Sequence, residues 1–201
     1  MTTAIMQLLQ QLPEPSRLAD WPQYSALGIE PAHVSALIEI ATNPAESGAL
    51  QSAAVHARRA LGQLGAGSAV GHLLNLFHQM ETDTWVVEEL PRVLALLGRA
   101  ATPAITAYAG NAGHPLFARG GAVLSLELMG AQHRGACVQA LIGLLANFAH
   151  NPPTLNGIII VALANLKAAE ALALIEEAFE ADAVDDLTTG DLDEIAAAIR
   201  S

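Results

Sequence analysis

Seven histidines and one cysteine are the residues of this sequence best suited to bind a transition metal or to act as base and nucleophile. Only His133 and Cys137 have the i,i+4 spacing that places two ligands on one helical face, and Gly135 predicts a helix that begins after His133. Zinc needs three or four ligands, and no further ligand can be tied to this pair. We therefore expect no metal here and a small core residue at Cys137. The histidines are His33, His56, His72, His78, His114, His133 and His150.

Nine carboxylates gather in residues 176–201, where Arg200 is the only basic residue. Carboxylates around a glycine can bind calcium, but the spacing here does not match a calcium-binding EF-hand loop. The other interpretation is a solvated end cap, in which Asp191 begins the last helix and like charges keep the terminus hydrated. We expect the cap, and calcium binding stays open as the alternative.

Sequence motifs that carry catalytic chemistry are absent. The chain has no Gly-x-x-x-x-Gly-Lys phosphate loop, no Gly-x-Gly-x-x-Gly turn, no His-Glu-x-x-His and no Gly-x-Ser-x-Gly. Residues 65–71, GAGSAVG, are rich in glycine but contain no lysine, and they lie in a predicted turn between helices. We therefore expect a protein that is not an enzyme and that holds no cofactor.

Composition limits the partners and the compartment. Hydrophobic residues make up 52% of the 201 residues and aromatic residues only 4%, so alanine and leucine must build the core, which favours helix. Residues 1–175 are nearly neutral, and the single lysine, Lys167, argues against a nucleic-acid surface. No run approaches the ~20 apolar residues of a membrane span. The single cysteine fits a reducing compartment, so we expect a cytoplasmic protein.

An internal repeat organises the chain. A hydrophobic residue followed by glycine recurs at Leu27-Gly28, Leu64-Gly65, Leu97-Gly98 and Met129-Gly130, and Leu166-Lys167 takes the same place in the last unit. The spacings are 37, 33, 32 and 37 residues. In each unit an apolar stretch ends at this position, where a left-handed residue typically ends a helix, and a second apolar stretch follows. The pattern predicts five helical hairpins.

The expected helices follow from this pattern. Glu30-Pro31 and Thr102-Pro103 are typical helix starts, with a capping residue followed by proline. We expect one domain over 1–201, with a cap helix in 1–15, repeats in 16–181 and an acidic cap in 182–201. The predicted first helices are 16–27, 49–64, 84–97, 115–129 and 154–166. The predicted second helices are 31–42, 68–80, 103–110, 135–149 and 168–181, with capping helices at 2–12 and 191–199.

Pro91 lies inside one predicted first helix, in EELPRVLALLG. An interior proline costs a helix roughly 3 kcal/mol. The apolar spacing nevertheless continues in phase across Pro91, so we expect a bent helix that continues past it, and the alternative is a helix that ends at Leu90.

Residues 57–74, ARRALGQLGAGSAVGHLL, resemble a HEAT repeat of the PBS-lyase type, whose units carry A-x-x-A-L-G-x-L-G-x-x-x-A-V-x-x-L-L. The resemblance extends loosely over residues 24–180. WVVEELPRVLALLG and NPPTLNGIIIVALANLKAAEALALIEEAF resemble a bacterial HEAT-repeat group of unassigned function. The resemblance implies an all-α fold, an α-solenoid or HEAT-like superhelix of about five hairpins with capping helices at the ends.

In HEAT arrays the second helices line the concave side, so the resemblance directs attention to their polar residues. His72, Asn75 and Gln79 follow one another at helical spacing, opposite an apolar stripe. Residues on neighbouring second helices extend this strip. The predicted interaction surface, called the second-helix surface below, consists of His33, His72, Asn75, Gln79, Thr106, Gln139 and Asn147. An ordinary solvated face is the alternative.

The predicted function is a scaffold or adaptor that binds another protein on the second-helix surface. The alternative, which rests on the resemblance of residues 57–74, is a lyase-like or chaperone-like protein that handles a tetrapyrrole or its acceptor protein. Arg58 and Arg59 lie on a first helix, and we expect them to face outward. We expect no nucleic acid and no membrane as partner.

Overall fold

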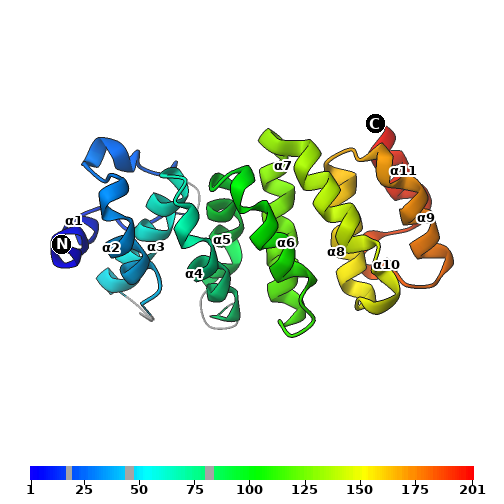
Figure 1. The fold of residues 1–201 in the computed structure, drawn as a ribbon, viewed down its shortest axis with the longest axis horizontal. Helices are drawn as coiled ribbons and strands as arrows, with labels where there is room; N and C mark the ends of the chain where they lie inside the picture. The colour runs from blue at the N-terminus through cyan, green and yellow to red at the C-terminus, as the bar shows by residue number, and fades with distance from the viewer. Residues whose placement is uncertain (17–19, 44–47, 80–83) are drawn as a thin grey trace. The chain divides into compact units, whose positions relative to one another are not determined.

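The computed structural model describes residues 1–16, 20–43, 48–79 and 84–201, and every regular element in these ranges is a helix or a helical turn (Figure 1). The all-α prediction is confirmed for this part of the chain. Contacts within the chain divide it into two compact units, Met1–Ala101 and Thr102–Ser201, and each is described by itself.

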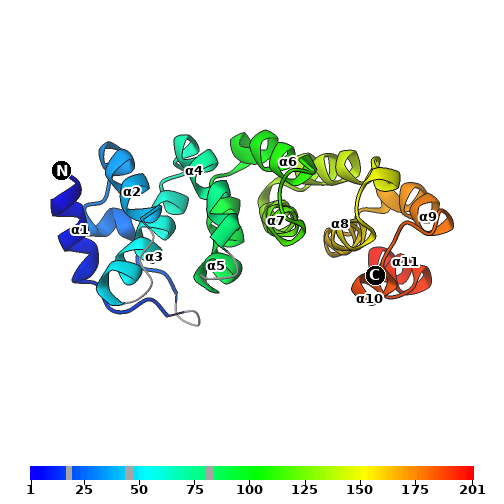
Figure 2. The ribbon, with the colours of Figure 1, turned by 90° about the horizontal axis from the view of Figure 1, so that it is seen from below.

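Unit 1 contains two rows of helices. Figure 2 shows α2 and α4 in one row and α3 and α5 in the other. Helix α3 packs against α1, α2 and α5, and α4 packs against α5. The helices are α1 (Thr2–Gln10), α2 (Val34–Ala41), α3 (Gly48–Gln63), α4 (Val70–Asn75) and α5 (Thr84–Leu96), with 3₁₀ turns at Tyr24–Leu27, Pro31–His33, Gly67–Ala69, Leu76–Gln79 and Arg99–Ala101.

The first predicted hairpin differs from the expectation. Of the predicted helix 16–27, residues 17–19 lie outside the described residues, residues 20–23 form no helix, and only Tyr24–Leu27 forms a 3₁₀ turn. Pro22 explains part of this, because proline disfavours the helical conformation in the residue before it. Residue 80 of the predicted helix 68–80 also lies outside the described residues, and Val70–Asn75 is the α-helical part of that helix.

Helix α5 continues through Pro91 to Leu96, as predicted, and the alternative of a helix that ends at Leu90 is wrong. Pro91 is buried, whereas Val87, one turn earlier, is exposed. Because proline has no N–H, the carbonyl group of Val87 has no donor at position 91. On the exposed side of the helix, water can take the place of that donor.

Unit 2 consists of helices that pack against one another. Helix α7 packs against α6, α8 and α9, while α8 packs against α10 and α11, and α9 packs against α11. The helices are α6 (Thr102–Gly110), α7 (Leu116–Leu145), α8 (Pro153–Asn165), α9 (Leu172–Glu180), α10 (Asp186–Thr189) and α11 (Leu192–Arg200), with 3₁₀ turns at Phe148–His150 and Ala169–Ala171.

The expected turn at Gly130 is wrong. Helical residues run from Leu116 to Leu145, and the interruption lies at His133, whose φ of −132° and ψ of 39° are not helical. Gly130 lies within the helix before this kink. A Cβ atom at Gly130 would overlap Cδ2 of Leu166 and lie 3.0 Å from its Cδ1, so the missing side chain permits close packing against the end of α8. The repeat therefore keeps its glycine here for packing and not for a left-handed turn.

At the other four repeat positions the left-handed turn is confirmed. The φ angles are +79° at Gly28, +59° at Gly65, +73° at Gly98 and +53° at Lys167. After Gly65, the N–H of Ala66 donates to the carbonyl group of Leu61 over 3.1 Å, which is the bond of a Schellman motif. Buried hydrophobic residues follow three of these turns, at Ile29, Ala66 and Ala168.

The predicted helix starts have different outcomes. Glu30 caps the turn at Pro31 in a reciprocal capping box with His33. Thr102 forms no such cap, because its hydroxyl group donates to Sδ of Met129 over 3.3 Å. Asp191 is the N-cap of α11, and its carboxylate accepts the N–H of Glu194 over 2.9 Å, as expected.

Candidate functional site

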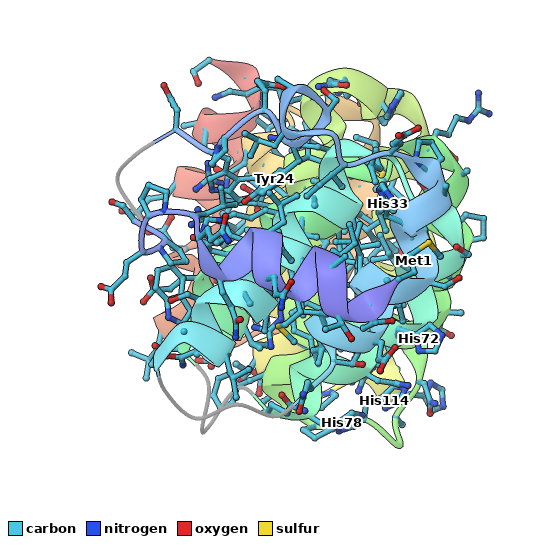
Figure 3. All side chains as sticks on the ribbon, turned by 90° about the vertical axis from the view of Figure 1, so that its left-hand side faces the viewer. Met1, Tyr24, His33, His72, His78 and His114 are labelled. Carbon is cyan, nitrogen blue, oxygen red and sulfur yellow. The ribbon has the colours of Figure 1, made fainter. Side chains whose placement is uncertain are left out.

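Four residues of the second-helix surface belong to unit 1. His72 and Asn75 on α4 are exposed, and neither side chain forms a hydrogen bond within the described residues, whereas Gln79, after α4, is half-buried. His33 is also half-buried, and its Nδ1 accepts the N–H of Glu30 over 3.2 Å. Figure 3 shows His33 and His72 toward the same edge of the unit, with Tyr24 apart from both. His72 and Asn75 are therefore the unit 1 residues most open to a partner.

The other three residues belong to unit 2. Gln139, in the second half of α7, is exposed and forms no hydrogen bond within the described part of the chain. The hydroxyl group of Thr106 donates to the carbonyl group of Thr102 over 2.8 Å. The side-chain amide of Asn147 donates to the carbonyl group of Gly143 over 3.3 Å. These two side chains are thus engaged within their own helical segments. A continuous strip through both groups of residues stays a prediction.

The two adjacent arginines of α3 do not face outward, so that expectation is wrong. Only 6% of Arg58 and 1% of Arg59 is exposed. Nε of Arg58 donates over 3.1 Å to the carbonyl group of Ala41, the last residue of α2. Such a contact satisfies a carbonyl group that a helix end leaves without an intrahelical partner.

Two further arginines cap helix ends in the same way. Nε of Arg119 donates to the carbonyl group of Ala109, near the end of α6, over 2.7 Å. Arg134 donates to the carbonyl groups of Leu166 and Lys167, after the end of α8, over 2.8 and 2.7 Å. These cations join neighbouring helices through backbone carbonyl groups.

Arg59 forms a buried ion pair with Glu89 of α5. Nε of Arg59 donates to Oε2 of Glu89 over 2.7 Å, and a second, shorter contact joins Nη2 to Oε1. Nη2 also donates to the carbonyl group of Ser16 over 3.0 Å, and the guanidinium carbon lies 5.0 Å from the ring centre of Trp21. The guanidinium group of Arg59 thus compensates the charge of Glu89, and both carboxylate oxygens are occupied by this pair.

Tyr24 and His56 form the second part of this polar network. The Tyr24 hydroxyl group lies 2.6 Å from Nδ1 of His56, and Nε2 of His56 lies 3.0 Å from the carbonyl group of Pro13. A carbonyl group only accepts, so Nε2 carries the proton and Nδ1 accepts from Tyr24. Burial raises the pKa of the Tyr24 hydroxyl group and lowers the pKa of His56. Both groups are neutral at pH 7, and their bonds connect residues 13–24 to α3.

A half-open cavity of about 130 Å³ lies beside this network. Among the described residues, Glu14 is the charged side chain of the lining, and Trp85 supplies an aromatic wall. Within the described part of the lining, the side chains form no pair of carboxylates. The lining residues are Glu14, Pro15, Gly48, Gln51, Ser52, Val55 and Trp85.

Comparisons with protein-family models, with curated proteins and with solved structures find no match. Functional arguments for this chain therefore rest on its own residues. Over the described ranges, no helix is both long and apolar enough to cross a membrane.

The possible metal ligands do not assemble. Among the described residues, no three His, Cys, Asp or Glu side chains form a group that could hold a metal ion. Cys137 is a fully buried core residue, as predicted, and burial raises the pKa of its thiol, which disfavours the nucleophilic thiolate. His133 lies at the kink of α7.

The C-terminal carboxylates have structural roles at two positions. Asp185 is the N-cap of α10, and it also accepts the hydroxyl groups of Thr154 and Thr188, each over 2.9 Å. These hydrogen bonds, the one from Thr154 first, hold the pKa of Asp185 below its usual value. Asp185 therefore ties α10 to α8, and Asp191 starts α11, which supports the end-cap interpretation of this segment.

An exposed apolar stripe on α7 was not anticipated. Phe117 is 70% exposed, and Leu124 and Leu128 are also exposed. Their spacing of seven and four residues places them on one face of the first half of α7. This stripe lies on a predicted first helix and is separate from the second-helix surface. The hydrophobic periodicity could have revealed it, because these residues lie out of phase with the buried Val123 and Leu126.

Proposed function

We propose that this protein is a scaffold without enzymatic activity, which binds another protein on the second-helix surface. The observation that supports this best is the distribution of its polar side chains. Ionisable side chains in the interior of unit 1 are bonded in pairs. Arg59 pairs with Glu89, and Tyr24 bonds to His56. His72, Asn75 and Gln139 instead expose polar side chains to solvent, which suits recognition of a polar protein surface.

The proposal includes a HEAT-like α-solenoid in which the hairpins stack in one row. Support comes from the repetition of local features, since left-handed residues recur at four of the five repeat positions and 3₁₀ turns precede α2, α4, α6 and α9. Within unit 1, α3 packs on both α2 and α5, and within unit 2, α7 packs on both α6 and α8. Contacts between hairpins that are neighbours in the sequence are typical of repeat proteins.

A protein partner fits these surfaces better than nucleic acid does. Arginines 58, 59, 119 and 134 are engaged in caps and ion pairs, which leaves them poorly placed to bind phosphate groups. A cytoplasmic location belongs to the same proposal and is supported by the single, buried cysteine. The alternative of a tetrapyrrole handler gains nothing from the cavity beside Trp85, because about 130 Å³ is below the roughly 300–1,000 Å³ of small-molecule sites.

The test is affinity capture from the source cell lysate with the full chain as bait. A matched bait carries His72→Glu and Asn75→Glu on the second-helix surface. Quantitative mass spectrometry should find at least one protein that the unchanged bait retains and the double variant loses. Identical retained proteins on both baits would refute the proposal.

A further inference from the structure

One face of α3 binds a non-helical segment of the same chain through its backbone. His56, Arg59 and Gln63 are spaced three and four residues apart, so they share a face of α3. They form hydrogen bonds to residues 11–16 and 20–24, which we call the strap. The strap follows α1 and ends at Tyr24, the first residue of the 3₁₀ turn Tyr24–Leu27. In the predicted repeat a first helix would lie here.

The bonds to the strap run mainly to carbonyl groups. Nε2 of His56 donates to Pro13 over 3.0 Å, and Nη2 of Arg59 donates to Ser16 over 3.0 Å. Gln63 forms two bonds, because its Nε2 donates to the carbonyl group of Pro22 over 2.9 Å and its Oε1 accepts the N–H of Tyr24 over 3.1 Å. A helix in this place would use its own carbonyl groups internally, so His56 and Gln63 would lose these acceptors.

Trp21 is the main side chain by which the strap contacts both α3 and α5. The surface under the strap, which we call the groove, is formed by His56, Arg59 and Gln63 of α3 and by Arg92 of α5. Its ring lies 5.0 Å from the guanidinium carbon of Arg59 and 4.9 Å from that of Arg92, which is exposed on α5. Both distances are in the range of cation–π contacts. The groove thus accepts an aromatic ring directly followed by proline, whose carbonyl group bonds to Gln63.

The strap does not use this groove fully. Nε1 of Trp21 is buried, yet it has no hydrogen-bond partner among the described residues. The half-open cavity of about 130 Å³ borders the strap at Glu14 and Pro15 and continues along α3 to Val55 and Trp85. A different segment could place an aromatic ring here without a buried N–H that lacks a partner, and could also fill the cavity. The strap therefore does not make every contact that the groove permits.

We propose that the groove formed by His56, Arg59, Gln63 and Arg92 is a docking site for a non-helical segment of another protein that carries an aromatic residue followed by proline, and that the strap occupies it in the free chain as an internal competitor. Such a segment offers carbonyl acceptors and, at proline, no N–H that needs a partner. This site lies on first helices, apart from the second-helix surface, and does not depend on the function proposed for that surface.

The test uses the full chain with Trp21→Ala, which weakens the strap, and a fluorescent peptide of residues 11–24, QLPEPSRLADWPQY. Fluorescence anisotropy should show that this variant binds the peptide and does not bind a scrambled peptide of the same composition. Adding Arg92→Ala should weaken binding about threefold or more through loss of one cation–π contact. Adding Arg99→Ala should not, because Arg99 is exposed and makes no contact with Trp21 among the described residues. No binding at about 1 mM peptide, or equal binding of the scrambled peptide, would overturn the proposal.

A second measurement covers the case in which Trp21→Ala does not fold. Hydrogen exchange of the unaltered chain is measured with and without excess peptide. Displacement of the strap should accelerate exchange of the Tyr24 amide, because that N–H is otherwise protected by Gln63. Unchanged exchange at Tyr24, or the same acceleration with the scrambled peptide, would contradict the proposal.

Discussion

The carboxylate of Glu89 on α5 accepts two hydrogen bonds from the guanidinium group of Arg59 on α3, and only 6% and 2% of these two side chains is exposed. The pair joins two predicted first helices that are 30 residues apart in sequence. Because it also holds Ser16 and contacts Trp21, it connects the strap to both helices. The interior of unit 1 is therefore organised by charge as well as by apolar packing.

Removing one partner of this pair should be strongly destabilising. Glu89→Ala leaves the buried guanidinium group of Arg59 without a counter-charge, and the expected loss is about 3–5 kcal/mol in the free energy of unfolding, measured by urea denaturation. The double variant Arg59→Met, Glu89→Leu should recover much of this loss, because no charge is then left buried. A loss below about 1 kcal/mol in Glu89→Ala would mean that water reaches the pair and that it is not buried in solution.

Gly130 and Gly135 form a matched pair on α7. Gly130→Ala should destabilise the chain by about 1–3 kcal/mol, because the new Cβ displaces Leu166. Gly135→Ala meets no atom within 4 Å and should stabilise the helix by about 0.5–1 kcal/mol. Thermal unfolding followed by circular dichroism measures both changes. Equal effects at the two positions would show that α7 and α8 do not pack as described.

Because His56 is buried, we expect the folded chain to lose stability in mild acid. Burial lowers the folded-state pKa of His56, Arg59 on the same helix lowers it further, and Glu89 and the Pro13 carbonyl group act in the opposite direction. The unfolded chain therefore binds more protons than the folded chain below the ordinary histidine pKa of about 6.5. The stability that this group contributes is present above pH 6.5 and is lost as the pH falls from there toward the folded-state pKa.

The variant His56→Gln isolates this effect. Its amide can donate to Pro13 and accept from Tyr24, but it does not titrate. Urea denaturation between pH 5 and 7.5 should show a weaker pH dependence of unfolding free energy for the variant than for the unaltered chain. Parallel curves for the two proteins would rule out His56 as the titrating group.

The repeat spacing predicted most elements of the fold. The predicted first helices at α3, α5 and α8 were located correctly, because left-handed turns leave a local signal at positions such as Gly65 and Gly98, whereas residues 20–23 of the predicted helix 16–27 form no helix. Gly130 shows the limit of this reasoning. A glycine is required equally by a positive φ and by a close neighbour, and only the position of Leu166 distinguishes the two causes.

The polar network could not be predicted in full. Arg59 was expected to face outward because it lies on a first helix, and its partner Glu89 is distant in sequence. The spacing of His56, Arg59 and Gln63 is a local signal of a polar helix face. What faces it depends on the path of the strap, which proline residues divert from the expected helix. The exposed positions of His72 and Asn75 followed from helical periodicity, and that of Gln139 from its place on a predicted second helix.

Small-angle X-ray scattering tests the proposed solenoid. A compact globule of 201 residues has a radius of gyration of roughly 16 Å. Hairpins that stack in one row should give a clearly larger value, with a pair-distance distribution skewed toward long distances. A radius of gyration near that of the globule would contradict the stacked arrangement.

Photo-crosslinking from defined positions tests most directly the central claim that a protein partner binds the second-helix surface. A photoreactive amino acid is placed in the full chain at Asn75 or Gln139 on that surface, or at Leu124 in the apolar stripe of α7. The account predicts that the captured partner crosslinks from positions 75 and 139 and not from 124. Crosslinks from position 124 alone would place the partner on the first helices and contradict the claim.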